Sequence, residues 1–246
     1  MSVRIQQAIF TSVQGPQLDG YQLISKSDGV TDELARELAH WGPPHDALQD
    51  SDEEATSLNF HPLRSGDFCI SRTVYAGSEY SSRAGLRVYT QMLIVPAAGL
   101  AQFENNPFSI WKAAVAGGRI HTLDSPPPAL PSFSLLGRGT VLSEEELADA
   151  TSVLEMDALA ELATLLQEKP HVAVITEMPA EQFIAVLFHL LPSEQRSQIS
   201  FSTGLKFSPR RPFRLTIAPQ DPVQQKTLGR LSGMHLFELP TCANTP

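Results

Sequence analysis

The residues of this chain that could perform chemistry are scattered along the sequence. Cys69 and Cys242 are far apart, and neither belongs to a CxxC pair. The seven histidines form no HExxH motif, so the sequence contains no recognisable zinc-binding pattern. They are at positions 40, 45, 61, 121, 171, 189 and 235.

A thiol becomes nucleophilic when a neighbouring base or cation lowers its pKa, and His61 is a candidate base for Cys69. A cryptic hydrolase that uses Cys69 or a carboxylate therefore stays open, although a cysteine inside an apolar strand is more often a small buried side chain.

Other catalytic signatures are missing from the sequence. There is no GxSxG elbow to hold a nucleophilic serine at the top of a sheet. There is no GxxxxGK[ST] loop either, and the segment GRGT at 137–140 lacks the lysine that reaches the terminal phosphates. The sequence therefore predicts no nucleotide site of that kind, no metal and no cofactor.

One cationic cluster stands out in a chain whose formal net charge is -9. It consists of Lys206, Arg210, Arg211 and Arg214. Guanidinium groups form bidentate bonds with carboxylates and phosphates, so the cluster is a candidate binding surface for an anion or an acidic partner. The alternative is a hairpin loop with solubilising charges. The negative net charge disfavours nucleic acid as a partner, because phosphate binding depends on Lys and Arg.

The elements that must position these residues are predicted to be mostly strands in the first half of the chain. Strands are expected at residues 3–11, 68–77 and 86–96, and helices at 31–41 and 108–116. The first strand loses its alternation at Ala8, which indicates a bulge or an edge position. Thr31 is the expected N-cap of the first helix. The acidic, polar residues 45–57 are expected to be an exposed loop.

Helices and strands alternate in the second half. Helical patterns follow Ser143, run from Met156 to Glu168, and recur at 179–191 and 224–231, while strands are expected at 171–176, 199–204, 213–219 and 235–239. The helix at 179–191 has so wide an apolar sector that it must be buried on more than one side. The predicted fold class is α+β (mixed α/β), with a mixed or largely antiparallel sheet and packed helices.

The domain organisation is expected to be one compact unit with two halves. Residues 1–124 form a strand-rich N-terminal half and residues 143–246 an α/β C-terminal half. The Pro-rich stretch between them, 125–142, is the linker candidate, because proline cannot donate a sheet hydrogen bond. No basic segment precedes an apolar one at the N-terminus, and no apolar run approaches the ~20 residues of a spanning helix, so a cytoplasmic protein is expected.

Two motifs carry a family resemblance. The first is RTVYAGSEYSSRAGLRVYTQMLIVP at 72–96, and the second is LLPSEQRSQISFST at 190–203. With YQLISKSDGVTDELARELAHW at 21–41, they make the chain similar to the N-terminal domain of the bacterial GTPase-associated protein family. The first motif matches the family at Gly77, Glu79, Tyr80, Arg83 and Gly85. The chain departs from the family at Leu86 and Thr90, where the family has Asn and His.

The resemblance implies a non-enzymatic adaptor that works near a GTPase or another nucleotide-dependent effector in bacterial signalling or conflict systems. Glu79, Tyr80 and Arg83 are then candidate contact residues, and an internal salt bridge between Glu79 and Arg83 is the alternative. The hypothesis from sequence is an adaptor or assembly module that acts through protein contacts. A cryptic hydrolase and a subunit of a homomeric assembly are the other possibilities.

Overall fold

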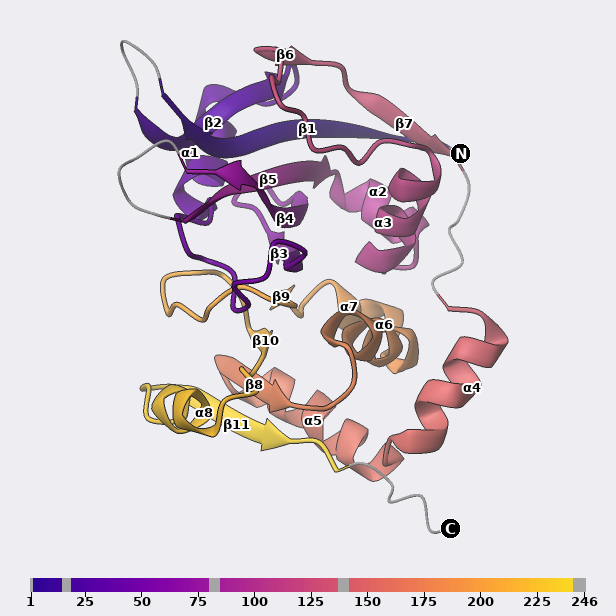
Figure 1. Ribbon diagram of the computed structural model, residues 1–246. Helices are drawn as coiled ribbons and strands as arrows, with labels where there is room; N and C mark the ends of the chain where they lie inside the picture. Colours follow the sequence, from indigo (N-terminus) through magenta and orange to yellow (C-terminus); the bar gives the residue numbers. More distant parts are fainter. Residues whose placement is uncertain (1, 15–18, 80–84, 137–141, 241–246) are drawn as a thin grey trace.

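The computed structural model of the chain describes residues 2–14, 19–79, 85–136 and 142–240. These residues form one mixed sheet whose strands follow the order β11-β8-β10-β9-β3-β4-β5-β1-β2-β6, and β7 pairs with β1 beside this path. The predicted α+β class is confirmed. Figure 1 shows the N-terminal strands in one half of the molecule and the C-terminal elements in the other, with β9 and β10 between them.

The N-terminal part of the sheet is an antiparallel array with helices on both faces. Its strands are β1 (Ser2–Val13), β2 (Gly20–Ser27), β3 (Thr56–Pro62), β4 (Phe68–Ser78) and β5 (Leu86–Val95), and its helices are α1 (Asp32–Trp41), α2 (Ala97–Gln102) and α3 (Pro107–Ala116). The three strands expected here are confirmed. The bulge or edge position expected at Ala8 of β1 is wrong, because β1 is an inner strand with a continuous register to β5, and the residue without a partner in the β1–β2 register is Ile24 of β2. The alternation is lost because β1 is buried on both faces around Ala8. Thr31 caps α1 by accepting a hydrogen bond from the Leu34 amide.

The expectation of an exposed loop at 45–57 is wrong for part of the segment. Ala47 and Leu48 are buried, and Leu48 forms an isolated bridge with Leu205. Both belong to a small apolar cluster with Phe213. The acidic residues around them concealed this short apolar pair in the sequence.

The C-terminal part of the sheet is parallel. Its elements are α4 (Glu144–Val153), α5 (Met156–Glu168), β8 (His171–Ile175), α6 (Ala180–Leu190), α7 (Ser193–Arg196), β9 (Phe201–Ser202), β10 (Leu215–Ile217), α8 (Pro222–Leu228) and β11 (Met234–Glu238). β10 pairs in parallel with both β8 and β9. The segment between β9 and β10 is therefore a crossover, and the expectation of a hairpin loop around the basic residues is wrong. Because β10 lies between two parallel partners, the chain must return across the sheet before it enters β10.

The expected linker at 125–142 contributes two strands to the sheet. β6 (Ala129–Leu130) pairs with the end of β2, and β7 (Phe133–Leu136) pairs with the start of β1. Three prolines precede β6 and Pro131 lies between β6 and β7, so the paired residues themselves supply the backbone donors that proline lacks. Residues 129–136 thus belong to the sheet, while residues 137–141 lie outside the described residues.

The main core joins the two parts of the chain on one face of the sheet. The rings of Phe108 and Phe201 stack 5.2 Å apart, and the Phe188 ring contacts Phe201 edge-on at 5.1 Å. Six consecutive residues of α6, from Phe183 to Phe188, are buried, which confirms that this helix is covered on more than one side. α1 covers the opposite face of the N-terminal strands, where its Leu34 and Leu38 belong to a second cluster.

Candidate functional site

Cys69 lies directly opposite His61 in the β3–β4 pairing. The structure thus brings together the two residues that the sequence suggested as a nucleophile and its base. Burial raises the pKa of the Cys69 thiol to about 12 and lowers the pKa of the His61 imidazole to about 4. Both groups are therefore held in their neutral forms at neutral pH, whereas a cysteine nucleophile needs a thiolate. Cys242 lies outside the described residues.

Glu79 anchors the end of β4 to the neighbouring strands. Its carboxylate accepts hydrogen bonds of 2.7 Å from the Ser12 hydroxyl and from the Tyr21 hydroxyl. The Tyr21 oxygen in turn accepts a hydrogen bond of 3.0 Å from the Val88 amide. Burial raises the pKa of Tyr21 well above its usual range, which keeps the phenol as a donor to Glu79. This network holds together β1, β2, β4 and β5 at the base of the β4–β5 loop.

The first motif contains four further positions of interest, Tyr80, Arg83, Leu86 and Thr90. Tyr80 and Arg83 lie outside the described residues, as does the expected salt bridge of Arg83. Of the two positions that depart from the family, Leu86 pairs with Ser78 at the start of β5. Thr90 is 1% exposed, and its hydroxyl lies 3.0 Å from the hydroxyl of Thr73. Thr90 is therefore part of the interior of the sheet.

Three of the four side chains in the basic cluster are bonded within this chain. The Lys206 ammonium forms an ion pair of 2.7 Å with Asp46. Arg211 donates to the Lys206 carbonyl at 2.9 Å, and burial lowers the pKa of its guanidinium. Arg214 donates to the Leu166 carbonyl, also at 2.9 Å. Lys206 and Arg214 thus tie the β9–β10 crossover to Asp46 and to α5, while Arg211 bonds within the crossover.

Arg210 is the member of the cluster that points its charge outward. It is exposed, and only its backbone amide bonds, to the Ser208 hydroxyl at 3.4 Å. No described residue forms an ion pair with its guanidinium. Of the four basic residues that are close in sequence, Arg210 is therefore the one whose guanidinium could bind a partner.

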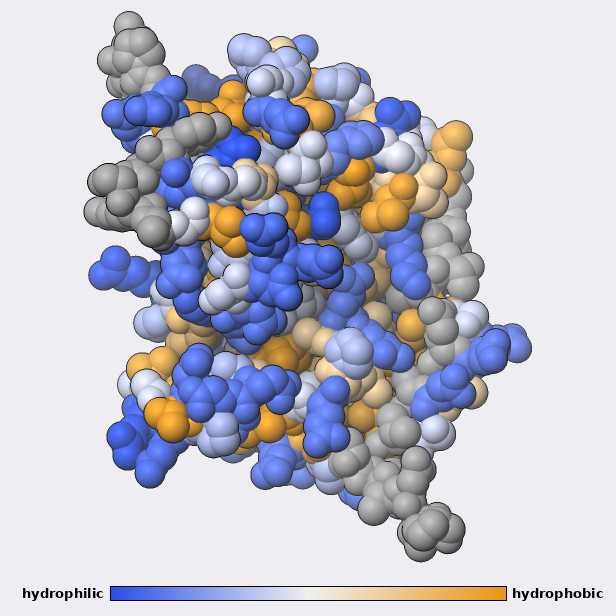
Figure 2. Space-filling view, viewed as in Figure 1, coloured by the Kyte–Doolittle hydropathy of each residue, from blue (hydrophilic) through white to orange (hydrophobic). Residues whose placement is uncertain are grey.

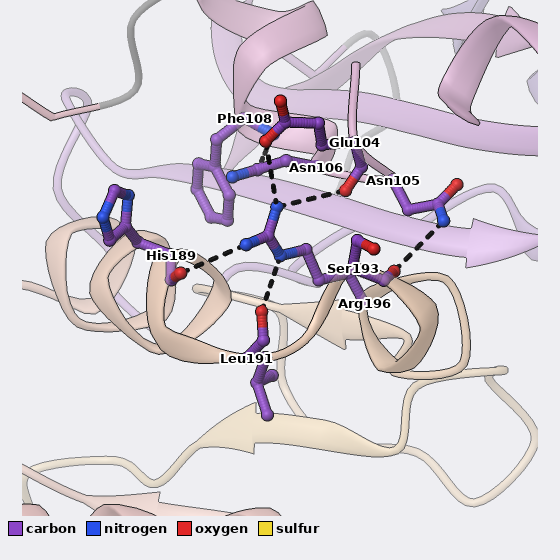
Figure 3. Close-up of polar contacts among 8 residues, drawn as sticks. All are labelled: Glu104, Asn105, Asn106, Phe108, His189, Leu191, Ser193 and Arg196. Carbon is purple, nitrogen blue, oxygen red and sulfur yellow. Dashed lines mark hydrogen bonds and ion pairs between the residues drawn. The ribbon is translucent and has the colours of Figure 1, made fainter. Parts of the chain in front are cut away.

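Arg196 connects the two parts of the fold, and sequence reasoning gave it no role beyond its place in the second motif. Its guanidinium donates to the carbonyls of Leu191 at 3.0 Å, His189 at 3.1 Å and Glu104 at 3.1 Å, as Figure 3 shows. The first two carbonyls lie at the C-terminal end of α6, where the last helical carbonyls have no partner within the helix. The third belongs to the turn between α2 and α3. One side chain thus ties an end of α6 to the N-terminal part of the chain.

The turn that receives Arg196 has an unusual backbone. Glu104 and Asn105 both have positive φ, at 56° and 55°. The Asn105 carboxamide donates to the Ser193 carbonyl at 3.1 Å, which adds a second contact beside that of Arg196 (Figure 3). Left-handed backbone is costly for residues other than glycine, so these contacts help to hold the turn. The contacts of Arg196 and Asn105 therefore have a structural role, because they join the turn between α2 and α3 to the end of α6 and to α7.

A buried polar group at the β3–β9 junction was also missed from sequence. The Asn59 Oδ1 atom accepts hydrogen bonds from Ser57 at 2.8 Å and from Ser202 at 2.7 Å. The Thr203 hydroxyl accepts a bond of 2.8 Å from the Leu58 amide. The alternation of Ser57, Asn59 and His61 in the sequence was the available signal. It marks a polar face of β3 that meets the polar face of β9.

Two of the surface grooves lie beside a helix that has exposed or partly buried apolar residues. The β2–α1 groove has a volume of about 530 Å³ and is lined by residues 22–26 of β2, four residues of α1 and Pro128. The α8 groove, of about 260 Å³, lies between α8 and the residues around Phe207. Val223 on α8 is 72% exposed and Leu231 is 41% exposed. Figure 2 shows apolar residues as small patches in a largely polar surface, one of them over α8.

Metal binding and membrane insertion find no support in the part of the chain that the structure describes. Within it, no group of three or more His, Cys, Asp or Glu side chains could hold a metal ion. None of its helices combines the length and the apolar character that crossing a membrane requires.

The fold and these contacts define an α+β protein in which one mixed sheet runs through both parts of the chain. Residues 4–133, more than half of the sequence, match the family described as GTPase-associated protein 1, N-terminal domain type 2. The chain belongs to this family, as its resemblance predicted. The match contains the first motif at 72–96, while the second motif at 190–203 lies beyond it. No curated protein matches the sequence.

Proposed function

We propose that the chain is a non-enzymatic adaptor or assembly module that acts through protein contacts in the cytoplasm of a bacterium. Its partner is a GTPase or another nucleotide-dependent effector of a signalling or conflict system. The observation that carries this proposal is membership in the GTPase-associated family, whose description links it to a GTPase without naming a reaction.

The chemistry of the described side chains supports the non-enzymatic part of the proposal. The thiol of Cys69 and the imidazole of His61 are adjacent, yet burial moves both pKa values away from those of a reactive pair. Most of the basic cluster is used inside the chain. The β2–α1 groove, the α8 groove and the exposed Arg210 offer contact surfaces to a partner.

The test is affinity capture from the native host followed by reconstitution. We expect the tagged chain to retain a specific GTPase or ATPase, and the two purified proteins to bind each other in a titration that depends on the bound nucleotide. Arg210→Glu probes the exposed charge of the crossover, and Lys169→Glu is the matched control at another exposed cation. A chain that retains no partner, or that turns over a substrate by itself, would overturn the proposal.

A further inference from the structure

The outer edge of β2 is open. β1 pairs with β2 along its inner side, and among the described residues the outer side is paired only at Lys26 and Ser27, by β6. The open stretch from Gly20 to Ile24 contains neither a charged residue nor a proline, the devices with which proteins commonly protect a free edge. A bulge at Ile24, which has no partner in the β1 register, is the protection that remains. The edge therefore offers unpaired backbone groups to an added strand.

The β2–α1 groove runs beside this open edge. Leu23 of β2 and the small residues Ala35 and Ala39 of α1 line it, and all three are only partly buried. Its volume of about 530 Å³ lies within the range of binding grooves. A groove between an edge strand and a helix offers main-chain hydrogen bonds on one side and side-chain space on the other.

The chain itself already uses the edge in this way. The extended segment that enters β6 places the Pro128 carbonyl 3.3 Å from the Lys26 amide and the Pro127 carbonyl 2.6 Å from the Ser25 hydroxyl. β6 then continues parallel to the end of β2. Two of the three prolines at 126–128 make these contacts through their carbonyls, and because proline lacks an amide donor, the chain's own segment cannot extend the ladder further.

The charges of the groove indicate what it accepts. Its charged lining residues are Lys26, Asp32 and Arg36, and Asp32 is paired with Lys26 at 2.6 Å. Arg36 is exposed and donates from Nε to the Asp32 carbonyl, so its terminal nitrogens remain available in a groove with one excess positive charge. A chain with a net charge of -9 thus has a local site for a carboxylate.

We propose that the β2–α1 groove binds an extended peptide segment of a partner protein by strand addition to β2. The segment places an apolar side chain over Ala35 and Ala39 and a carboxylate beside Arg36. This inference rests on the proposed role in protein contacts and names a surface for it.

The probe is a displayed library of eight-residue peptides, selected against the purified full chain. We expect enrichment of sequences with alternating apolar residues and an acidic residue. For a synthetic peptide of the enriched type, Arg36→Glu weakens binding roughly tenfold or more, and Ala39→Trp abolishes it by filling the groove. Arg230→Glu, the same charge reversal at an exposed arginine outside the groove, leaves binding within about twofold. The bound peptide slows hydrogen exchange of the amides between Gly20 and Ile24.

Several results would overturn the proposal. One is a selection that enriches no peptide. Another is a peptide that binds the folded Arg36→Glu and Ala39→Trp variants as tightly as the unchanged chain. A peptide that slows hydrogen exchange only of amides outside 20–24 would also contradict the proposal. A further one is protection of 20–24 without peptide together with a mass that rises with concentration, which would assign the edge to a second copy of the chain. If the Arg36→Glu and Ala39→Trp variants capture a host GTPase as well as the unchanged chain does, the groove proposal fails and the adaptor role stands. If the groove binds peptide but the chain captures no host partner, the adaptor role fails and the groove proposal stands.

Discussion

Asn59 of β3 and Ser202 of β9 share a buried hydrogen bond of 2.7 Å at the point where the antiparallel and parallel parts of the sheet meet. Both residues are 1% exposed. The same carboxamide oxygen also accepts from Ser57. Polar groups at such depth must be bonded, and this one side chain satisfies two of the buried hydroxyls at the junction.

Replacing Asn59 by alanine is therefore expected to lower the free energy of unfolding by about 3 kcal/mol, because two buried hydroxyls lose their acceptor. Urea denaturation followed by circular dichroism measures the change. The double variant with Ser202→Ala should lose less than the sum of the two single changes, since the two residues share one interaction. Gln224→Ala, on exposed α8, is the control and should stay within about 0.5 kcal/mol of the unchanged chain. Additive effects would mean that the junction does not depend on this bond.

The parts of the fold that could be predicted from sequence are those whose pattern is local. β1, β4 and β5 are long strands rich in branched and aromatic residues, and α1 has a cap, an acidic first turn and an apolar face within eleven residues. Each pattern is complete without reference to another segment. β9 and β10 were also expected as strands, at 199–204 and 213–219, but their parallel pairing was not, because strand direction depends on partners distant in the chain.

The basic cluster shows the same limit for the site. Lys206, Arg211 and Arg214 are neighbours in sequence, and sequence reasoning grouped them by that proximity. Their actual partners are Asp46, far upstream, and the backbone carbonyls of Lys206 and Leu166. Long cationic side chains find acceptors that the fold provides, and no local pattern identifies a backbone carbonyl as such an acceptor.

Arg196→Met is expected to lower the free energy of unfolding by about 3 kcal/mol, because three carbonyls on two segments lose a charged donor. Arg196→Lys should recover only part of that loss, since an ammonium lacks the planar fork of the guanidinium. Chemical denaturation measures both variants, and Arg210→Met, at the exposed arginine of the crossover, is the matched control. Full recovery with lysine would show that charge alone is required.

The buried imidazole of His61 makes stability depend on pH. Its pKa falls from 6.5 to about 4 in the folded chain because burial disfavours the charged form. The unfolded chain then binds more protons between these values, so this contribution is present above pH 6.5 and is lost as the pH falls toward 4. Between pH 7 and pH 5 the unchanged chain should lose about 2 kcal/mol more than His61→Gln, which has no group that titrates there. Equal pH dependence of the two proteins in urea titrations would contradict a neutral His61.

The thiol of Cys69 is expected to be unreactive as long as the chain is folded. Burial raises its pKa to about 12, so its thiolate fraction at pH 8 is on the order of a thousandfold below that of an exposed cysteine. In a Cys242→Ser background, where Cys69 is the remaining thiol, Ellman's reagent should label it only in denaturant, at a rate set by unfolding. Cys69→Ala in the same background controls for other reactive groups. Rapid labelling of the native chain, at a rate whose pH dependence has its midpoint near neutral pH, would instead indicate an activated thiolate. That result would favour the hydrolase hypothesis over the adaptor.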